Sequence, residues 1–113
     1  MANPNPNSHV DLERNTLRLL CSVLIKPGTR IEICKLLNPS VFLDPLHRTV
    51  FEEICWMRAI GAKRLRKLLP GQVTNRGFPD FDLRELLAPN RVTKAEIEGL
   101  FESAVKLLGE LVF

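Results

Sequence analysis

The sequence predicts an all-α domain, a compact bundle of five to six helices, and three observations lead to this prediction. Apolar residues recur at helical spacing in every long segment. No run alternates apolar and polar side chains over enough residues to form a strand, and β-favouring residues are not enriched. With 113 residues, 45% of them hydrophobic, the chain is long enough for one core and too short for two ordinary domains. We therefore expect one helical domain over residues 8–113.

The chain opens with residues that favour neither a core nor a membrane. Residues 1–7 alternate asparagine and proline, which predicts a disordered tail, because the prolines remove backbone donors and no apolar surface is offered for burial. This opening lacks the charged and apolar regions of a signal peptide, and the longest apolar runs are too short to cross a bilayer. We expect a soluble cytoplasmic protein without membrane contact.

Residues 8–25 predict the first helix, which we expect to end at the Lys-Pro-Gly sequence of residues 26–28. Thr29 is then expected to open a short second helix. Glu32, three residues later, would complete a capping box with the threonine, and Asn38 and Pro39 would end the helix.

The third helix is the best specified in the sequence. Asp44 is expected to cap it, and Pro45 suits the first helical position because the N–H that it lacks would have no helical partner. Gly61 is expected to end it in the left-handed conformation. A helical wheel over this segment buries His47 and exposes Trp56.

The remaining segments predict three further helices. Residues 62–69 form a short one, closed by the Pro-Gly pair at 70–71 and followed by a loop over 72–79. Asp80 or Asp82 can cap a short helical turn that follows. Thr93 and Glu96 form a second capping box, which opens one long amphipathic helix reaching residue 112.

The residue types argue against catalysis. The chain has two histidines and no tyrosine, and it contains no glycine-rich phosphate loop, no G-x-S-x-G and no H-E-x-x-H sequence. Its three cysteines form no CxxC pair and lie among apolar residues, as small buried side chains do in a reducing compartment. We expect no enzyme, no cofactor, no metal site and no disulfide framework.

His47 lies on an apolar helix face, where a histidine is either a structural residue or a ligand or base. Its i+4 neighbour is Phe51 rather than a cysteine or an acid, which favours the structural alternative. We expect a buried histidine hydrogen-bonded to a backbone carbonyl of the 41–43 loop.

Positive charge is concentrated in residues 58–77, which contain six basic residues and no acid, whereas residues 78–113 carry a net charge of −3. Once the leucines of this segment face the core, its charged side chains must point outward. They form either a solvated or protein-contacting face or a site for sequence-independent phosphate binding, which could be DNA. The candidate residues are Lys63, Arg64, Arg66 and Lys67.

Trp56 is the one large apolar side chain of the third helix that the wheel places outside, beside Thr49, Glu52 and Ile60. Exposed aromatic side chains often anchor protein interfaces. The alternative is that another helix of the same domain covers the indole.

One motif resembles a known family. A leucine-rich first helix containing Leu17, Leu20 and Leu24 precedes F-x-x-x-x-H-R-x-x-F. This arrangement resembles the N-terminal domain of DnaB-type replicative helicases over residues 12–61, and the helicase-binding domain of DnaG-type primases looks similar in fold. The residues of the motif are Phe42, His47, Arg48 and Phe51.

The resemblance implies a helical, non-catalytic interaction domain that self-associates or meets a replicative helicase, primase or loader. It implies a structural role for the four motif residues and supplies no catalytic residue. After residue 61 the chain departs from the family, because a basic K-R-L-R-K stretch stands where the family has an acidic or neutral connection. No Walker A motif occurs in the chain, so it cannot be a helicase motor by itself.

Overall fold

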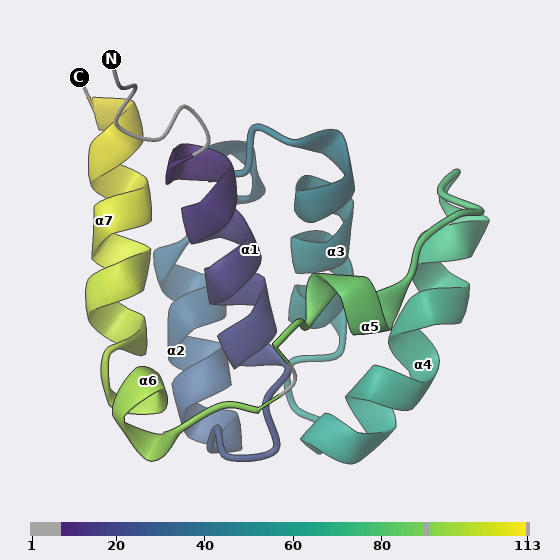
Figure 1. The fold of residues 1–113 in the computed structure, drawn as a ribbon, viewed down its shortest axis with the longest axis horizontal. Coiled ribbons are helices and arrows are strands. Elements are labelled where there is room, and N and C mark those ends of the chain that lie inside the picture. The colour runs from purple at the N-terminus through teal and green to yellow at the C-terminus, as the bar shows by residue number, and fades with distance from the viewer. Residues whose placement is uncertain (1–7, 90, 113) are drawn as a thin grey trace.

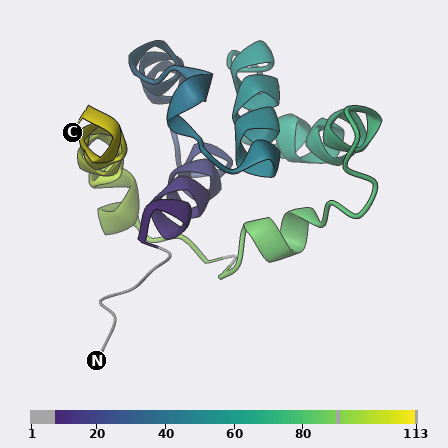
Figure 2. The same ribbon diagram turned by 90° about the horizontal axis from the view of Figure 1, so that it is seen from above.

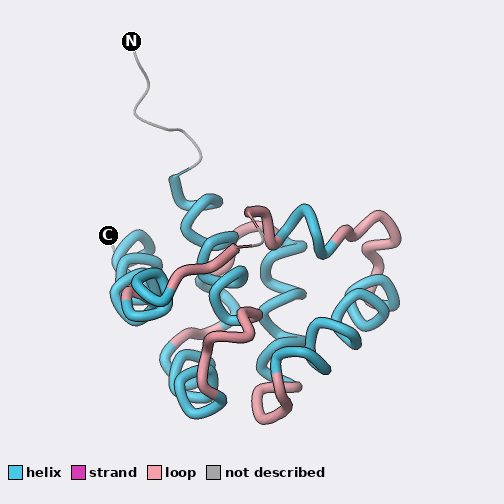
Figure 3. Tube along the Cα trace, turned by 60° about the horizontal axis from the view of Figure 1, so that its bottom comes forward, coloured by secondary structure: helices cyan, strands magenta, loops and turns pink. Residues whose placement is uncertain are grey.

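The computed structural model describes residues 8–89 and 91–112, and these residues are helical with irregular connections and no strand (Figure 3). The predicted all-α class is confirmed, with seven α-helices instead of five or six. The predicted tail, residues 1–7, lies outside the described residues. The elements are α1 (Ser8–Leu20), α2 (Pro27–Leu36), the 3-10 turn η1 (Pro39–Val41), α3 (Pro45–Trp56), α4 (Ala62–Asn75), α5 (Leu83–Leu86), α6 (Lys94–Glu98) and α7 (Leu100–Val112).

Three of the predicted caps are confirmed. The Asp44 carboxylate accepts the backbone N–H groups of Leu46 and His47 at the start of α3, where Pro45 occupies the first helical position. Asp82 caps α5 by accepting the N–H of residue 84. Both hydrogen bonds of the Thr93 and Glu96 capping box are present at α6. These caps depend only on neighbouring residues, which is why the sequence reveals them.

The predicted boundary between the first two helices is wrong. Helix α1 ends at Leu20, and α2 begins at Pro27 with Lys26 at the cap position and no side-chain cap bond. Thr29 therefore lies inside the first turn, and the predicted capping box with Glu32 is absent. Proline sets the start because its fixed φ suits the first helical position.

The predicted ends of the third and fourth helices are also wrong. Gly61 has φ −64° and precedes α4 as its cap residue, so it is not a left-handed end of α3. Helix α4 continues through Pro70 to Asn75, which shortens the predicted loop. Its three fully buried apolar residues are spaced by four, and the last of them, Val73, lies beyond the proline. Burial of Val73 offsets the hydrogen bond that Pro70 removes.

The predicted final helix is two helices. Gly99 separates α6 from α7, so the chain turns between the capping box and the longer helix. The outward face of α7 also carries large apolar side chains, since Phe101 and Val105 are exposed while Leu100, Ala104 and Leu107 are fully buried.

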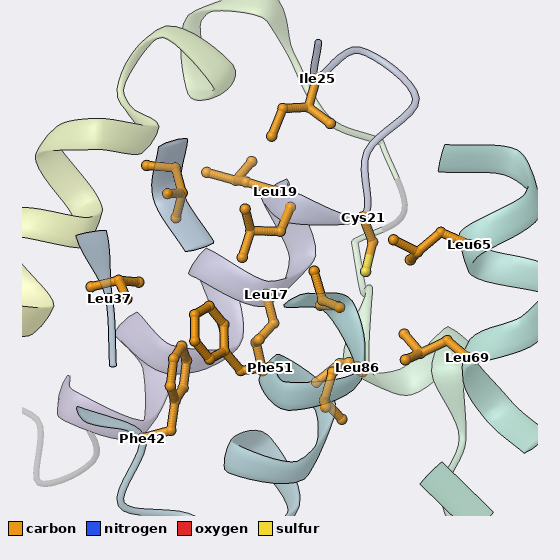
Figure 4. Packing of buried hydrophobic residues seen from close by; sticks show 14 of the residues in the cluster. Leu17, Leu19, Cys21, Ile25, Leu37, Phe42, Phe51, Leu65, Leu69 and Leu86 are labelled. Carbon is orange, nitrogen blue, oxygen red and sulfur yellow. The ribbon is translucent and has the colours of Figure 1, made fainter. Parts of the chain in front are cut away.

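Helix α1 is the centre of the domain, with α7 along one side and α3 along the other (Figures 1 and 2). Helix α4 packs on the far side of α3, and α5 contacts both α1 and α4. A close-up of the core shows the rings of Phe42 and Phe51 facing each other next to α1 (Figure 4). Their centroids are 4.6 Å apart with 26° between the ring planes, an offset stack that adds to apolar burial.

Among the described residues, no helix has both the length and the hydropathy that crossing a bilayer requires.

Replacement of Phe51 by alanine should lower the free energy of unfolding by about 3 to 5 kcal/mol, because the ring is fully buried and stacked. Denaturant titration followed by circular dichroism measures this change. Phe101→Ala is the matched control, since Phe101 is 46% exposed, and it should change stability by less than about 1 kcal/mol. Equal effects of the two substitutions would contradict the described core.

Candidate functional site

The motif residue His47 is buried, as predicted, but the prediction of its hydrogen-bond partner is wrong. Its Nδ1 lies 2.8 Å from Oε1 of Glu13, not against a carbonyl of the 41–43 loop. The histidine that does reach this loop is His9, whose Nε2 lies 3.1 Å from the Val41 carbonyl oxygen and 2.9 Å from Oε2 of Glu13. A carboxylate from α1 therefore joins two histidines from different parts of the chain.

Glu13 has no exposed surface, and its two oxygens face four donors. Besides the two histidines, the backbone N–H groups of Leu43 and Asp44 donate to it at 2.7 and 3.4 Å. A carbonyl oxygen only accepts hydrogen bonds, so His9 donates from Nε2 where it meets Val41. This arrangement satisfies the buried carboxylate and fixes the approach of the chain to α3.

The other motif residues are also bound within the fold. Arg48 donates from Nε to the Phe42 carbonyl oxygen at 3.1 Å, which ties the first turn of α3 to the loop before it. Phe42 and Phe51 form the stacked pair of the core. All four motif residues thus make internal contacts.

Several arginines fasten the ends of helices to distant segments. Arg30 is fully buried on α2 and donates to the carbonyls of Leu20 and Ile60 at 3.0 and 2.6 Å. Arg66 donates from Nε to the Cys21 carbonyl at 2.7 Å. The prediction that Arg66 points outward is wrong, because its guanidinium holds the end of α1.

The rest of the predicted basic site is exposed. Lys63, Arg64 and Lys67 lie on the outer face of α4, and their side chains make no hydrogen bond or ion pair with another described residue. Together with Leu68, which is 41% exposed, they line a surface hollow of about 540 Å³. We call these four residues the basic surface. It consists of three cationic side chains beside one exposed leucine side chain.

Trp56, the last residue of α3, is 81% exposed, so the alternative in which another helix covers it is wrong. Its predicted neighbours are not all available. Thr49 is only 8% exposed, so its placement on the outer face is wrong; α3 packs against both α1 and α4, and more than one of its sides is therefore buried. Ile60 is partly buried against the core, and Glu52 pairs with Arg76 at 2.7 Å. Trp56 is the freely exposed member of the predicted interface.

A pocket that sequence reasoning missed lies between α1, α3, α5 and the loop that follows α4. Its volume is about 590 Å³, and the half-buried rings of Phe78 and Phe81 form part of the wall. No hydroxyl or thiol side chain lines it. Its polar lining consists of Arg14, His47, Asp80, Asp82 and Glu85.

One ion pair joins the first and sixth helices. Arg18 donates from Nη1 to Oε2 of Glu96 at 2.8 Å, and its other nitrogens donate to the carbonyls of Pro89 and Arg91. The hydrogen bond from Arg18 lowers the pKa of Glu96 to about 2, and the Thr93 backbone N–H adds to the effect.

Comparison of the chain with protein-family models, curated proteins and solved structures gives no match. The assignment of a function therefore rests on the residues and geometry described above. Within the described residues, no cluster of three or more histidine, cysteine or acidic side chains is arranged to hold a metal ion.

Glu13→Gln should lower the free energy of unfolding by about 1.5 to 3 kcal/mol, because an amide nitrogen would replace one acceptor oxygen among four donors. Urea titration at neutral pH measures the loss. Glu32→Gln, at an exposed position of α2, should leave stability within about 0.5 kcal/mol of wild type. If both variants unfold at the same urea concentration, the Glu13 network does not stabilise the fold.

The Glu96 ion pair predicts a pH dependence of stability. Because the pKa of Glu96 is about 2 in the folded chain and 4.5 ordinarily, its stabilisation is complete above the ordinary value and is lost as the pH falls towards 2. Melting curves of wild type and Glu96→Gln should therefore differ at neutral pH and converge over this range. Glu98→Gln, at an exposed position nearby, is the control and should follow wild type. A constant difference between Glu96→Gln and wild type would overturn the prediction.

Proposed function

We propose that this chain is a cytoplasmic, non-catalytic helical interaction domain of DNA replication, which binds a replicative helicase, primase or loader or associates with itself. The observation that carries the proposal is the exposure of Trp56 at the end of α3. Tryptophan is the residue type most often found at the energetic centre of protein interfaces, and it gains most when a partner removes the indole from water.

The fold itself makes little use of this indole. The buried side of α3 is formed by other residues, and no described helix covers Trp56. An exposed aromatic side chain without a packing role favours contact with another molecule.

The replication context comes from the resemblance to the N-terminal domain of DnaB-type helicases. It is supported by the internal contacts of the motif, since Phe42 and Phe51 stack, Arg48 binds the Phe42 carbonyl and His47 binds Glu13. These are the structural roles that the resemblance implies. The helicase, primase and loader follow as partner classes from the same resemblance.

Trp56→Ala should weaken binding to a purified DnaB-type helicase, DnaG-type primase or helicase loader by about 30-fold or more, the effect of losing an interface hot spot of about 2 kcal/mol. Size-exclusion chromatography and calorimetric titration measure association, with the wild-type chain alone testing self-association. Stability should stay within about 0.5 kcal/mol of wild type, because the indole is exposed.

Phe101→Ala is the matched control, since it removes another partly exposed aromatic ring from a different helix. It should leave binding unchanged. Absence of self-association and of binding to all three partner classes would overturn the proposal.

The basic surface favours a second candidate function, nucleic-acid binding that does not depend on sequence. Three cations without an ion-pair partner among the described residues are available to phosphates. No aromatic side chain lines this hollow, so base stacking within it would not contribute.

For this second function, the logarithm of the affinity for DNA should fall with the logarithm of the salt concentration with a slope of about −3, one unit per cation. Fluorescence anisotropy with a labelled oligonucleotide measures it. Arg64→Ala combined with Lys67→Ala should reduce the slope by about 2. Lys26→Ala with Lys35→Ala, exposed positions on α2 and its cap, should not change it. No binding at low salt would eliminate this function.

A further inference from the structure

The pocket of about 590 Å³ between α1, α3, α5 and the loop after α4 has the size of a site for a small organic molecule. Its apolar lining comes from three segments of the chain. Leu46 lies on α3, Phe78 and Phe81 lie in the loop, and Leu86 lies on α5. Such a lining can bury the apolar part of a ligand, while a few polar groups determine which ligand binds.

The loop that carries the two rings is held in place by local contacts. Gly77 begins it with φ 106°, a backbone conformation that glycine adopts without strain. The N–H of Phe81 donates to the carbonyl oxygen of Phe78 at 3.1 Å and closes the turn between the rings. Asp82 then caps α5. The aromatic wall is therefore formed before a ligand binds, which lowers the entropic cost of binding.

His47 brings a polar atom to the pocket from its buried side. The residue lines the pocket although it is only 6% exposed. Its Nδ1 contacts Glu13 at 2.8 Å, and its Nε2 has no hydrogen-bond partner among the described residues. In this part of the chain, the fully enclosed side-chain nitrogen or oxygen without a partner is Nη2 of Arg30. The Nε2 of His47 is therefore not fully enclosed and is open to the pocket.

Glu13 fixes the orientation of this imidazole. The carboxyl group of Glu13 is itself held by the backbone N–H groups of Leu43 and Asp44. In the tautomer that donates from Nδ1 to Glu13, the Nε2 of His47 has a lone pair and accepts a hydrogen bond. In that tautomer the pocket has an acceptor at a fixed position for an N–H group of a ligand.

The lining of the pocket carries an excess of negative charge. Asp80, Asp82 and Glu85 are exposed, and they form no ion pair with another described residue. Arg14 supplies the positive charge of the lining, and its Nη1 donates to the carbonyl oxygen of Ala88 at 3.1 Å. Three carboxylates thus oppose one guanidinium, although the whole chain has a net charge of +3. This local field favours a cationic ligand over an anionic one.

We propose that the pocket binds a small organic cation, a protonated primary amine or a guanidinium group on an aromatic or aliphatic body. The rings of Phe78 and Phe81 contact the apolar body, and the Nε2 of His47 accepts a hydrogen bond from the N–H group. The carboxylates of the lining offset the charge of the ligand. The inference does not rest on the proposed function, since neither Trp56 nor the basic surface lines this pocket.

The test uses the full chain with phenethylammonium as the probe. Titration followed by NMR of the histidine ring resonances should show saturable shifts at His47, with a dissociation constant of about 1 mM. His9 is the internal control, because it also contacts Glu13 but does not line the pocket, and its resonances should move less. Phenylpropanoate, an anion of similar size, should bind at least about tenfold more weakly.

Asp80→Asn combined with Glu85→Gln should weaken binding of phenethylammonium by about threefold to tenfold, because two of the three carboxylates are lost. Glu98→Gln combined with Glu102→Gln is the matched control. It changes the net charge by the same amount at exposed positions of α6 and α7 outside the pocket, and it should leave the affinity unchanged. Melting curves should show that both double variants are as stable as wild type, because all four positions are exposed.

The same cationic groups occur on free amines and on the basic side chains of a partner chain. A second titration, with acetyl-phenylalanyl-arginine amide, distinguishes these sources. Tighter binding of this peptide than of phenethylammonium assigns the pocket to a partner's side chain, and weaker binding assigns it to a free ligand. The proposal is overturned by the absence of saturable shifts at His47 with both probes, by equal binding of phenylpropanoate, or by an affinity that the Asp80 and Glu85 substitutions do not change.

Discussion

The fold depends on one buried carboxylate. Glu13 lies in the middle of the central helix and accepts hydrogen bonds from two backbone N–H groups just before α3 and from the side chain of His47 within it. The Asp44 cap forms at the same place, so the start of α3 is fixed from both sides. A buried carboxyl group whose two oxygens have four partners specifies one arrangement, because a shift of either segment would remove some of these partners.

Arginine side chains also hold distant segments together through hydrogen bonds. Arg18, Arg30 and Arg66 each donate to backbone carbonyls of segments distant in the sequence. Arg30 and Arg66 bind carbonyls at the end of α1, where the last carbonyls have no helical partner, whereas Arg18 binds the connection between α5 and α6. Much of the positive charge of the chain is therefore structural. Only a small part of the basic segment remains available to a partner, which limits any phosphate contact to the basic surface.

The sequence predicts the parts of the fold that depend on near neighbours. Asp44 and the Thr93 and Glu96 pair cap their helices as their spacing indicates, and the wheel correctly buries His47 and exposes Trp56. The sequence does not predict the features that depend on contacts between distant residues. His9 and Glu13 look like an ordinary polar pair on α1, and their role follows only from the packing of α3 more than 30 residues later.

At the candidate site, too, contacts with distant residues decide which side chains of α3 are exposed, and the sequence does not predict them. A wheel treats a helix as having one buried side, and on that basis Thr49 belongs with Trp56. Helix α3 contacts α4 as well as α1, Thr49 is buried, and Arg76 at the end of α4 pairs with Glu52. The indole remains outside both contacts. Because neither the core nor α4 uses it, no packing requirement of the described fold accounts for Trp56, which is why the proposed interface is centred on this side chain.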